Sequence, residues 1–227
     1  MVVEMERERT ASRIIGALIL VQMVSGALIN FGVEAPLFGE PGFLVNAASH
    51  ASQIALGAVL GLAAGALSLA IAITAYPVFR QHSQAMALWF VALSIAGLSA
   101  VAVESMNVMS MLSLSQEYAK ANVADRDQLQ VLRVVVASAR NWAHFISLII
   151  AGCTIFVMYA VLYRFSLVPR ALAAFGLAAV VLQIATVAMP LFGQGVVFLL
   201  LAPLGVSQLA LALWLIVKGF RKEGVAS

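Results

Sequence analysis

Residues 86–112, MALWFVALSIAGLSAVAVESMNVMSML, contain one charged side chain, that of Glu104. A helix needs about 20 predominantly apolar residues to cross a bilayer core of about 30 Å. This stretch is long enough to cross, and a single carboxyl group does not prevent insertion. The sequence therefore predicts a membrane-spanning helix here.

Five further stretches share this character and are separated by prolines, glycines or charges. Of the 227 residues, 63% are hydrophobic and 10% charged, with a mean hydropathy of +1.03, whereas soluble domains have about 25% charged residues. We therefore expect an all-α, polytopic transmembrane helix bundle, with one transmembrane domain over residues 1–227 and a polar outer loop at 115–133. The six expected spanning helices are residues 14–30, 52–76, 86–112, 134–163, 171–189 and 196–217.

The distribution of lysine and arginine predicts the orientation, because cytoplasmic loops carry an excess of these residues. One side holds nine: Arg7, Arg9, Arg13, Arg80, Arg164, Arg170, Lys218, Arg221 and Lys222. The other side holds four: Lys120, Arg126, Arg133 and Arg140. This bias predicts a multi-pass protein of the cytoplasmic (inner) membrane with both termini in the cytoplasm. The same positions explain the net charge of +3 without nucleic-acid binding.

Ionisable side chains inside a membrane are costly and are functional candidates by default. Glu104 follows Gln84 by 20 residues, and His144 precedes Arg164 by 20 residues. At 1.5 Å per residue, both lie about 30 Å from the inner surface. Arg140 lies one helical turn from His144 on the same face. The sequence predicts that Glu104 meets Arg140 and His144 near the outer boundary.

Two polar residues extend this group, Asn107 one turn beyond Glu104 and Arg133 farther along the stripe of Arg140. The candidate ligand-binding or proton-linked residues are thus Glu104, Asn107, Arg133, Arg140 and His144. Three interpretations remain open. The group is a clamp between helices, the polar end of an outward-facing pocket, or a site of proton or redox chemistry.

A redox or metal site would use His144 as a ligand, for haem or copper. No second histidine lies at its depth, which disfavours bis-histidine haem. Met106 and Met109 are alternative ligands, since thioethers bind Cu(I). Methionine is also an ordinary packing residue in apolar bundles. The sequence therefore does not decide whether the protein binds haem, copper or no cofactor.

Three amides, Gln22, Gln183 and Gln208, fall near mid-depth of the first, fifth and sixth spans. Such amides usually bond neighbouring helices, and they are also able to line a polar path. Gly57, Gly61 and Gly65 form a small-residue ridge. Such a ridge permits close helix packing, within the bundle or in a homo-oligomer.

Signatures of several enzyme classes are missing from the sequence. It contains no GxSxG, P-loop, HExxH or GxGxxG motif. No lysine lies within an expected span, which excludes a retinal Schiff base of the rhodopsin type. Whether the protein is an enzyme is therefore undecided.

Four short runs resemble a bacterial family of small integral membrane proteins that is known only as a domain of unknown function. They are residues 112–118 (LSLSQEY), 139–143 (ARNWA), 162–170 (LYR and LVPR) and 211–220 (LALWLIVKGF). The resemblance extends from about Arg13 to Phe220. It implies a six-helix membrane protein and transfers no activity.

Three functions are consistent with these observations. The first is binding or transport of a small lipophilic compound through an outward-facing pocket, with the bilayer as its surroundings. The second is a membrane redox or metal protein, and the third is an accessory subunit of a membrane complex. The first is our preferred hypothesis, with Glu104, Arg140 and His144 as the polar anchor.

Overall fold

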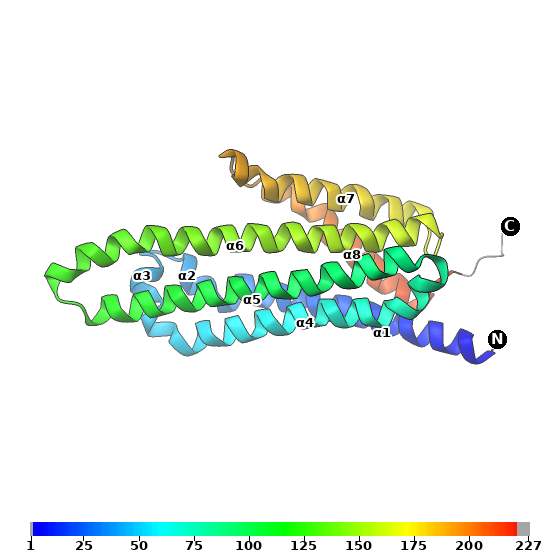
Figure 1. Cartoon of the computed structure of the whole chain (residues 1–227), viewed down its shortest axis with the longest axis horizontal. Helices are drawn as coiled ribbons and strands as arrows, with labels where there is room; N and C mark the ends of the chain where they lie inside the picture. The colour runs from blue at the N-terminus through cyan, green and yellow to red at the C-terminus, as the bar shows by residue number, and fades with distance from the viewer. Residues whose placement is uncertain (1, 222–227) are drawn as a thin grey trace. The chain divides into compact units, whose positions relative to one another are not determined.

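The computed structural model describes residues 2–221, with residues 2–5 and Pro36 described by backbone only. Lys222, which entered the charge count, lies outside these residues. The described chain is helical, and residues 2–221 contain no β-strand. The long helices are α1 (Val2–Leu28), α4 (Ala51–His82), α5 (Gln84–Lys120), α6 (Val123–Arg164), α7 (Arg170–Ala188) and α8 (Ala202–Val217) (Figure 1). Short helical segments join them: η1 (Ile29–Val33), α2 (Ala35–Phe38), α3 (Phe43–Asn46), η2 (Ala48–His50), η3 (Met189–Phe192) and η4 (Phe198–Leu201).

Six helical stretches of the described chain are long and apolar enough to cross a membrane. The predicted all-α class with six spanning helices is therefore confirmed. Each expected span falls within or largely overlaps one of them. They are Glu6–Val33, Ala48–His82, Gln84–Lys120, Val123–Arg164, Arg170–Phe192 and Phe198–Val217.

Residues 115–133 were expected to form a polar loop, but nearly all of them are helical. Helix α5 continues to Lys120 and α6 begins at Val123, so only Ala121 and Asn122 are non-helical. This segment is rich in Gln, Glu, Lys, Arg and Leu, which are good helix formers in water as well as in lipid. The two helices have 37 and 42 residues. At 1.5 Å per residue they are about 55 and 63 Å long, well beyond a bilayer core.

The second expected span, residues 52–76, ends before the helix that contains it. Pro77 lies inside α4, which continues to His82. A proline inside a helix removes one backbone hydrogen bond, and here the later turns continue regardless. The break comes at Ser83, whose hydroxyl accepts a hydrogen bond from the backbone N–H of Met86 at 3.4 Å. Serine is a preferred N-cap residue, so Ser83 begins α5.

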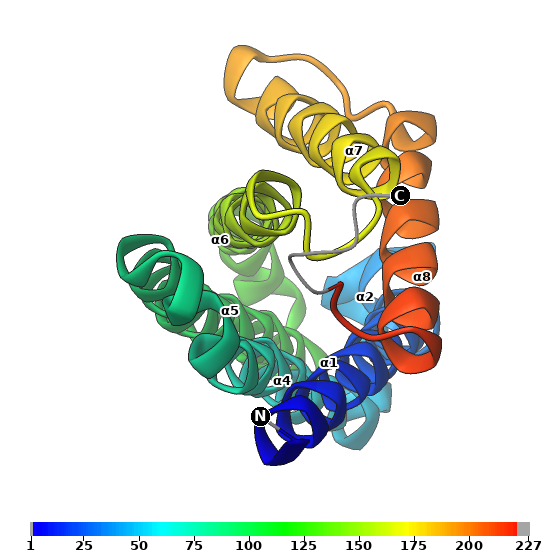
Figure 2. The same ribbon diagram turned by 90° about the vertical axis from the view of Figure 1, so that its right-hand side faces the viewer.

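The chain divides into two compact units, and α1, α4, α5 and α6 each contribute to both. The first unit consists of residues 1–23, 67–97 and 148–227. In it, α7 and α8 lie side by side (Figure 2). The fully buried Tyr159 donates a hydrogen bond to Ser207 at 3.2 Å. A methyl group at Gly176 would overlap the Tyr159 ring, so glycine is what allows α7 to approach α6 here.

The second unit consists of residues 24–66 and 98–147. Its apolar core joins α2, α3, α4 and α5, with Phe43, Ile54 and Met111 buried together. The buried Ser115 fixes this arrangement. Its hydroxyl donates to the Leu44 carbonyl at 3.0 Å and accepts from the Ala48 N–H at 2.8 Å. The segment after the first span is thereby held against α5.

The glycine ridge of α4 faces neighbours in its own chain. A Cβ at Gly57 would meet Val33 at 3.1 Å, and one at Gly65 would meet Leu98 at 2.9 Å. At Gly61 the nearest atom would be the Ser105 hydroxyl, at 3.6 Å. Close packing inside the second unit therefore accounts for these glycines. Association of chains through them stays a prediction.

Candidate polar site in the second unit

Helices α5 and α6 bring Glu104 and His144 into direct contact. His144 Nδ1 lies 2.7 Å from one oxygen of the Glu104 carboxyl group. Ser147 donates to the other oxygen at 2.8 Å, and Arg140 Nη2 lies 3.5 Å from the first. Residues 140, 144 and 147 are spaced by four and three positions, so one face of α6 presents all three. The predicted contact between Glu104, Arg140 and His144 is therefore present.

A second carboxylate completes the group. Arg140 Nη2 donates to Glu34 at 3.0 Å, and both side chains are buried. Glu34 lies between η1 and α2, at the N-cap position of α2. The Phe38 ring lies 4.8 Å from the Arg140 guanidinium carbon, in a cation–π contact. We refer to Glu34, Glu104, Arg140, His144 and Ser147 as the polar cluster.

Glu34 was missed by sequence reasoning, which treated the first loop only as a break between spans. One signal was available. Helix α6 presents two basic groups, Arg140 and His144, and Glu104 is the single acid within the expected spans. A buried guanidinium needs its charge balanced. Two acids, Glu34 and Glu40, lie in the first loop and could have supplied the second carboxylate.

The cluster contains two carboxylates, one guanidinium and one imidazole, so it is neutral when His144 is protonated and all the others are ionised. Burial raises the pKa of the Glu34 carboxyl group above its ordinary value, and the attraction of Arg140 offsets only part of this effect. Glu34 lies just beyond the first span, which ends at Val33. The cluster thus has a carboxyl group that binds a proton more readily than an exposed one.

The protonation of the His144 ring follows from its partner. An ionised carboxylate only accepts hydrogen bonds, so Nδ1 carries the proton that lies toward Glu104. The other ring nitrogen, Nε2, makes no hydrogen bond within residues 2–221. The imidazole is 24% exposed. In the neutral ring Nε2 therefore offers a lone pair to a proton or to an external donor.

A model of the family described as "Domain of unknown function (DUF4386)" matches residues 14–219. The chain belongs to this family. No curated protein and no solved structure matches it. The matched range contains the entire polar cluster, residues 14–33 of the first span and all of the other five spans. The family description assigns no activity, so function has to be argued from the geometry of this family member.

The other predicted site residues lie apart from the cluster. Asn107 donates to the Val103 carbonyl of its own helix at 2.9 Å, and Arg133 is exposed. Met106 and Met109 line an apolar groove of about 590 Å³ between α4 and α5. Met106 is about 200° around α5 from Glu104, so this groove lies on the opposite face of the helix from the cluster.

Among the described residues, no group of three or more His, Cys, Asp or Glu side chains is arranged to hold a metal ion. The lining of the methionine groove does not include His144. The structure thus does not bring together the three residues predicted as metal ligands. Cys153, in α6, is a free thiol and half-buried.

Proposed function

We propose that this DUF4386 member binds or transports a small lipophilic compound, and that His144 is the polar anchor for it. The observation that carries the proposal is the free Nε2 of a partly exposed histidine whose other nitrogen is held by the partly buried Glu104 carboxylate. Such a nitrogen accepts a hydrogen bond from a hydroxyl or weakly acidic group. The expected compound is therefore mostly apolar and has one such donor.

The polar cluster supports this role because its members hold the imidazole in place. Glu104 fixes the ring through Nδ1, and Ser147 and Arg140 in turn hold the Glu104 carboxylate. A fixed donor or acceptor loses little freedom when a ligand binds, which favours affinity.

The test uses a pair of probes with the same ring system. Purified protein in detergent is titrated with 1-naphthol, which has a hydroxyl donor, and with 1-methoxynaphthalene, which lacks it. We expect the wild-type protein to prefer 1-naphthol by about tenfold, the value of one hydrogen bond. His144→Gln should reduce this preference while the protein stays folded.

His50 provides the matched control. It belongs to the same unit but is exposed, and its Nδ1 lies 2.9 Å from the Asn46 carbonyl, outside the cluster. His50→Gln should leave the preference unchanged. Equal binding of the two probes by the wild-type protein would contradict the anchor role.

A second function is favoured by the bonding of Arg140, which bridges carboxylates from two parts of the unit. In this alternative the cluster is a clamp that only fixes α6 against α5 and the segment containing Glu34. Glu104→Gln would then abolish accumulation in the membrane. A folded Glu104→Gln variant with weakened 1-naphthol binding would instead support the ligand site.

We further propose that the protein lies in the cytoplasmic membrane with both termini in the cytoplasm. The nine basic residues on the side of the termini support this orientation. A fluorescent protein fused after Ser227 should fold and fluoresce, and alkaline phosphatase at the same position should be inactive. The reverse result would place the C-terminus outside.

A further inference from the structure

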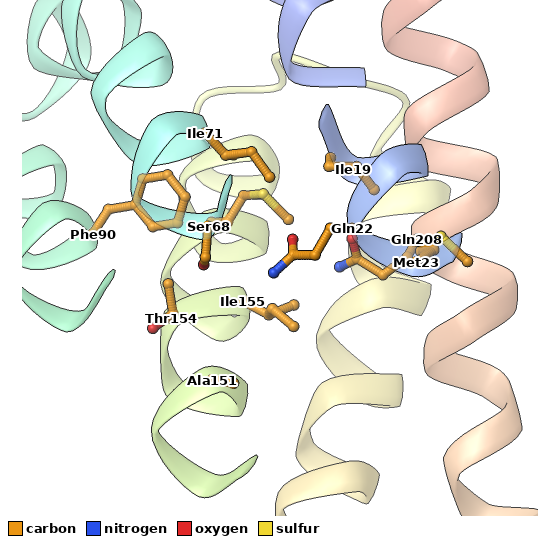
Figure 3. Close-up of a pocket in the computed structure, with 11 residues that line it drawn as sticks. Ile19, Gln22, Met23, Ser68, Ile71, Phe90, Ala151, Thr154, Ile155 and Gln208 are labelled. Atoms are coloured by element: carbon orange, nitrogen blue, oxygen red, sulfur yellow. The ribbon is translucent and has the colours of Figure 1, made fainter. Parts of the chain in front are cut away.

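A cavity of about 160 Å³ lies in the first unit and shares no residue with the polar cluster (Figure 3). Helices α1, α4, α5, α6 and α8 all contribute to its lining. Most of the surface is apolar, with Ile71, Phe90 and Ile155 among the larger side chains. The polar side chains in the lining are those of Gln22, Ser68, Thr154 and Gln208. None of the lining residues is charged.

Gln208 is the residue whose contacts indicate that the cavity binds a ligand. It is 9% exposed, and its Nε2 makes no hydrogen bond within the described chain. Figure 3 shows the Gln208 and Gln22 amides directed into the same space. A buried amide donor without a partner is unfavourable. The site therefore has a donor that an acceptor from outside the chain would satisfy.

Thr154 and Ser68 do not satisfy this donor. The Thr154 hydroxyl donates to the Ile150 carbonyl of its own helix at 3.0 Å. Neither hydroxyl has a hydrogen bond with Gln208.

The size and polarity of the cavity define the class of ligand. An engineered apolar cavity of about 150 Å³ binds benzene, so this space accommodates about one aromatic ring. The uncharged lining disfavours an ion, because burying an unpaired charge is costly. The free amide N–H selects a molecule with an acceptor oxygen.

We propose that this cavity binds an uncharged molecule of about one ring in size, with a carbonyl oxygen that accepts a hydrogen bond from Gln208. This site is separate from the His144 site, which selects a hydrogen-bond donor. Either proposal can therefore fail without the other.

The probe is 4-fluoroacetophenone, added to the full-length protein in detergent and followed by fluorine NMR. The comparison probe is 4-fluorotoluene, which has a methyl group in place of the acetyl group. We expect the wild-type protein to bind the ketone more tightly. Gln208→Leu should weaken ketone binding about tenfold, the loss of one hydrogen bond, and leave 4-fluorotoluene binding unchanged.

Gln183→Leu is the matched control. Gln183 is also a buried amide in the first unit, but it does not line the cavity and it donates to the Leu148 carbonyl at 3.3 Å. Both probes should bind this variant as they bind the wild-type protein. A second variant, Ser68→Leu, keeps Gln208 and fills part of the cavity, so it should weaken binding of both probes.

Three results would overturn the proposal. One is equal affinity of the wild-type protein for the two probes, and another is an equal loss of both in Gln208→Leu. The third is ketone binding that Ser68→Leu does not change, which would place the ketone elsewhere. Absence of binding by either probe would overturn the proposal as well, because the cavity would then not accept a molecule of one ring.

Discussion

The Arg140 guanidinium contacts two carboxylates, the buried one of Glu34 and the partly buried one of Glu104. Removing one partner of a buried ion pair leaves an uncompensated charge and typically costs about 3–5 kcal/mol. Arg140→Met should therefore lower the free energy of unfolding by this amount, as measured by thermal or denaturant unfolding in detergent.

An exposed ion pair provides the comparison. Lys120 and Glu117 are 3.0 Å apart, and their side chains are 72% and 65% exposed. Exposed pairs contribute little, because water screens both charges. Lys120→Met should leave the unfolding transition where it is. A similar loss in both variants would mean that the burial of Arg140 is not what makes its contacts strong.

The pH dependence of stability should report on Glu34. Its pKa is raised in the folded protein from an ordinary value of 4.5. Below this value the carboxyl group is protonated in both states, and its stabilising effect is fully present. As the pH rises toward the folded-state pKa, the unfolded chain ionises first, so stability is lost.

Glu34→Gln removes this titration. The melting temperature of the wild-type protein minus that of Glu34→Gln should therefore decrease as the pH is raised above 4.5. A difference that grows with pH would mean that attraction to Arg140 outweighs burial.

At the residue scale, the sequence predicted three members of the cluster because helical spacing relates depth and face to residue number. Glu104, Arg140 and His144 all lie on regular helices, where this relation holds. Glu34 lies between η1 and α2, where no periodicity assigns a direction to a side chain. Its contact with Arg140 spans 106 residues of sequence, and only the folded structure reveals such a contact.

At the scale of elements, the close approach of α6 and α7 depends on Gly176. A methyl group there would overlap the buried Tyr159 ring. Overpacking of a core typically costs about 1–3 kcal/mol. Gly176→Ala should lower the unfolding temperature measurably in a thermal assay.

Gly205→Ala is the control within the same unit. Gly205 lies in α8, and a Cβ there would meet nothing within 4 Å. Alanine is favoured over glycine in a helix by about 0.5–1 kcal/mol, so this variant should be as stable as the wild-type protein or slightly more stable. Equal destabilisation by both alanines would contradict the steric explanation.

The helix ends were harder to predict than the helices themselves. Hydropathy locates the part of a helix that lies in lipid, because the apolar run must match the bilayer core. It does not locate where a helix ends in water. For this reason residues 86–112 identify the apolar part of α5, whereas they do not give the end of the helix at Lys120. Helical propensity and capping residues, such as Ser83 before α5, determine those ends.

For the whole molecule, composition alone predicted the class correctly. A chain with 63% hydrophobic and 10% charged residues must expose apolar surface, and a bilayer provides the surroundings for it. The division into two units was not predictable in this way. It depends on which parts of the long helices pack together, and hydropathy does not specify the packing partner of a helical segment.

The long separation between Glu34 and Arg140 also has a consequence for the synthesis of the protein. Their hydrogen bond joins residues 106 positions apart. Ribosomes add about 5–20 residues per second, so Glu34 is made roughly 5–20 s before its cation. During this interval the first span is already long enough to insert. The carboxyl group therefore waits for its partner at the end of the first span. Completion of α6 then supplies the cation of this buried ion pair.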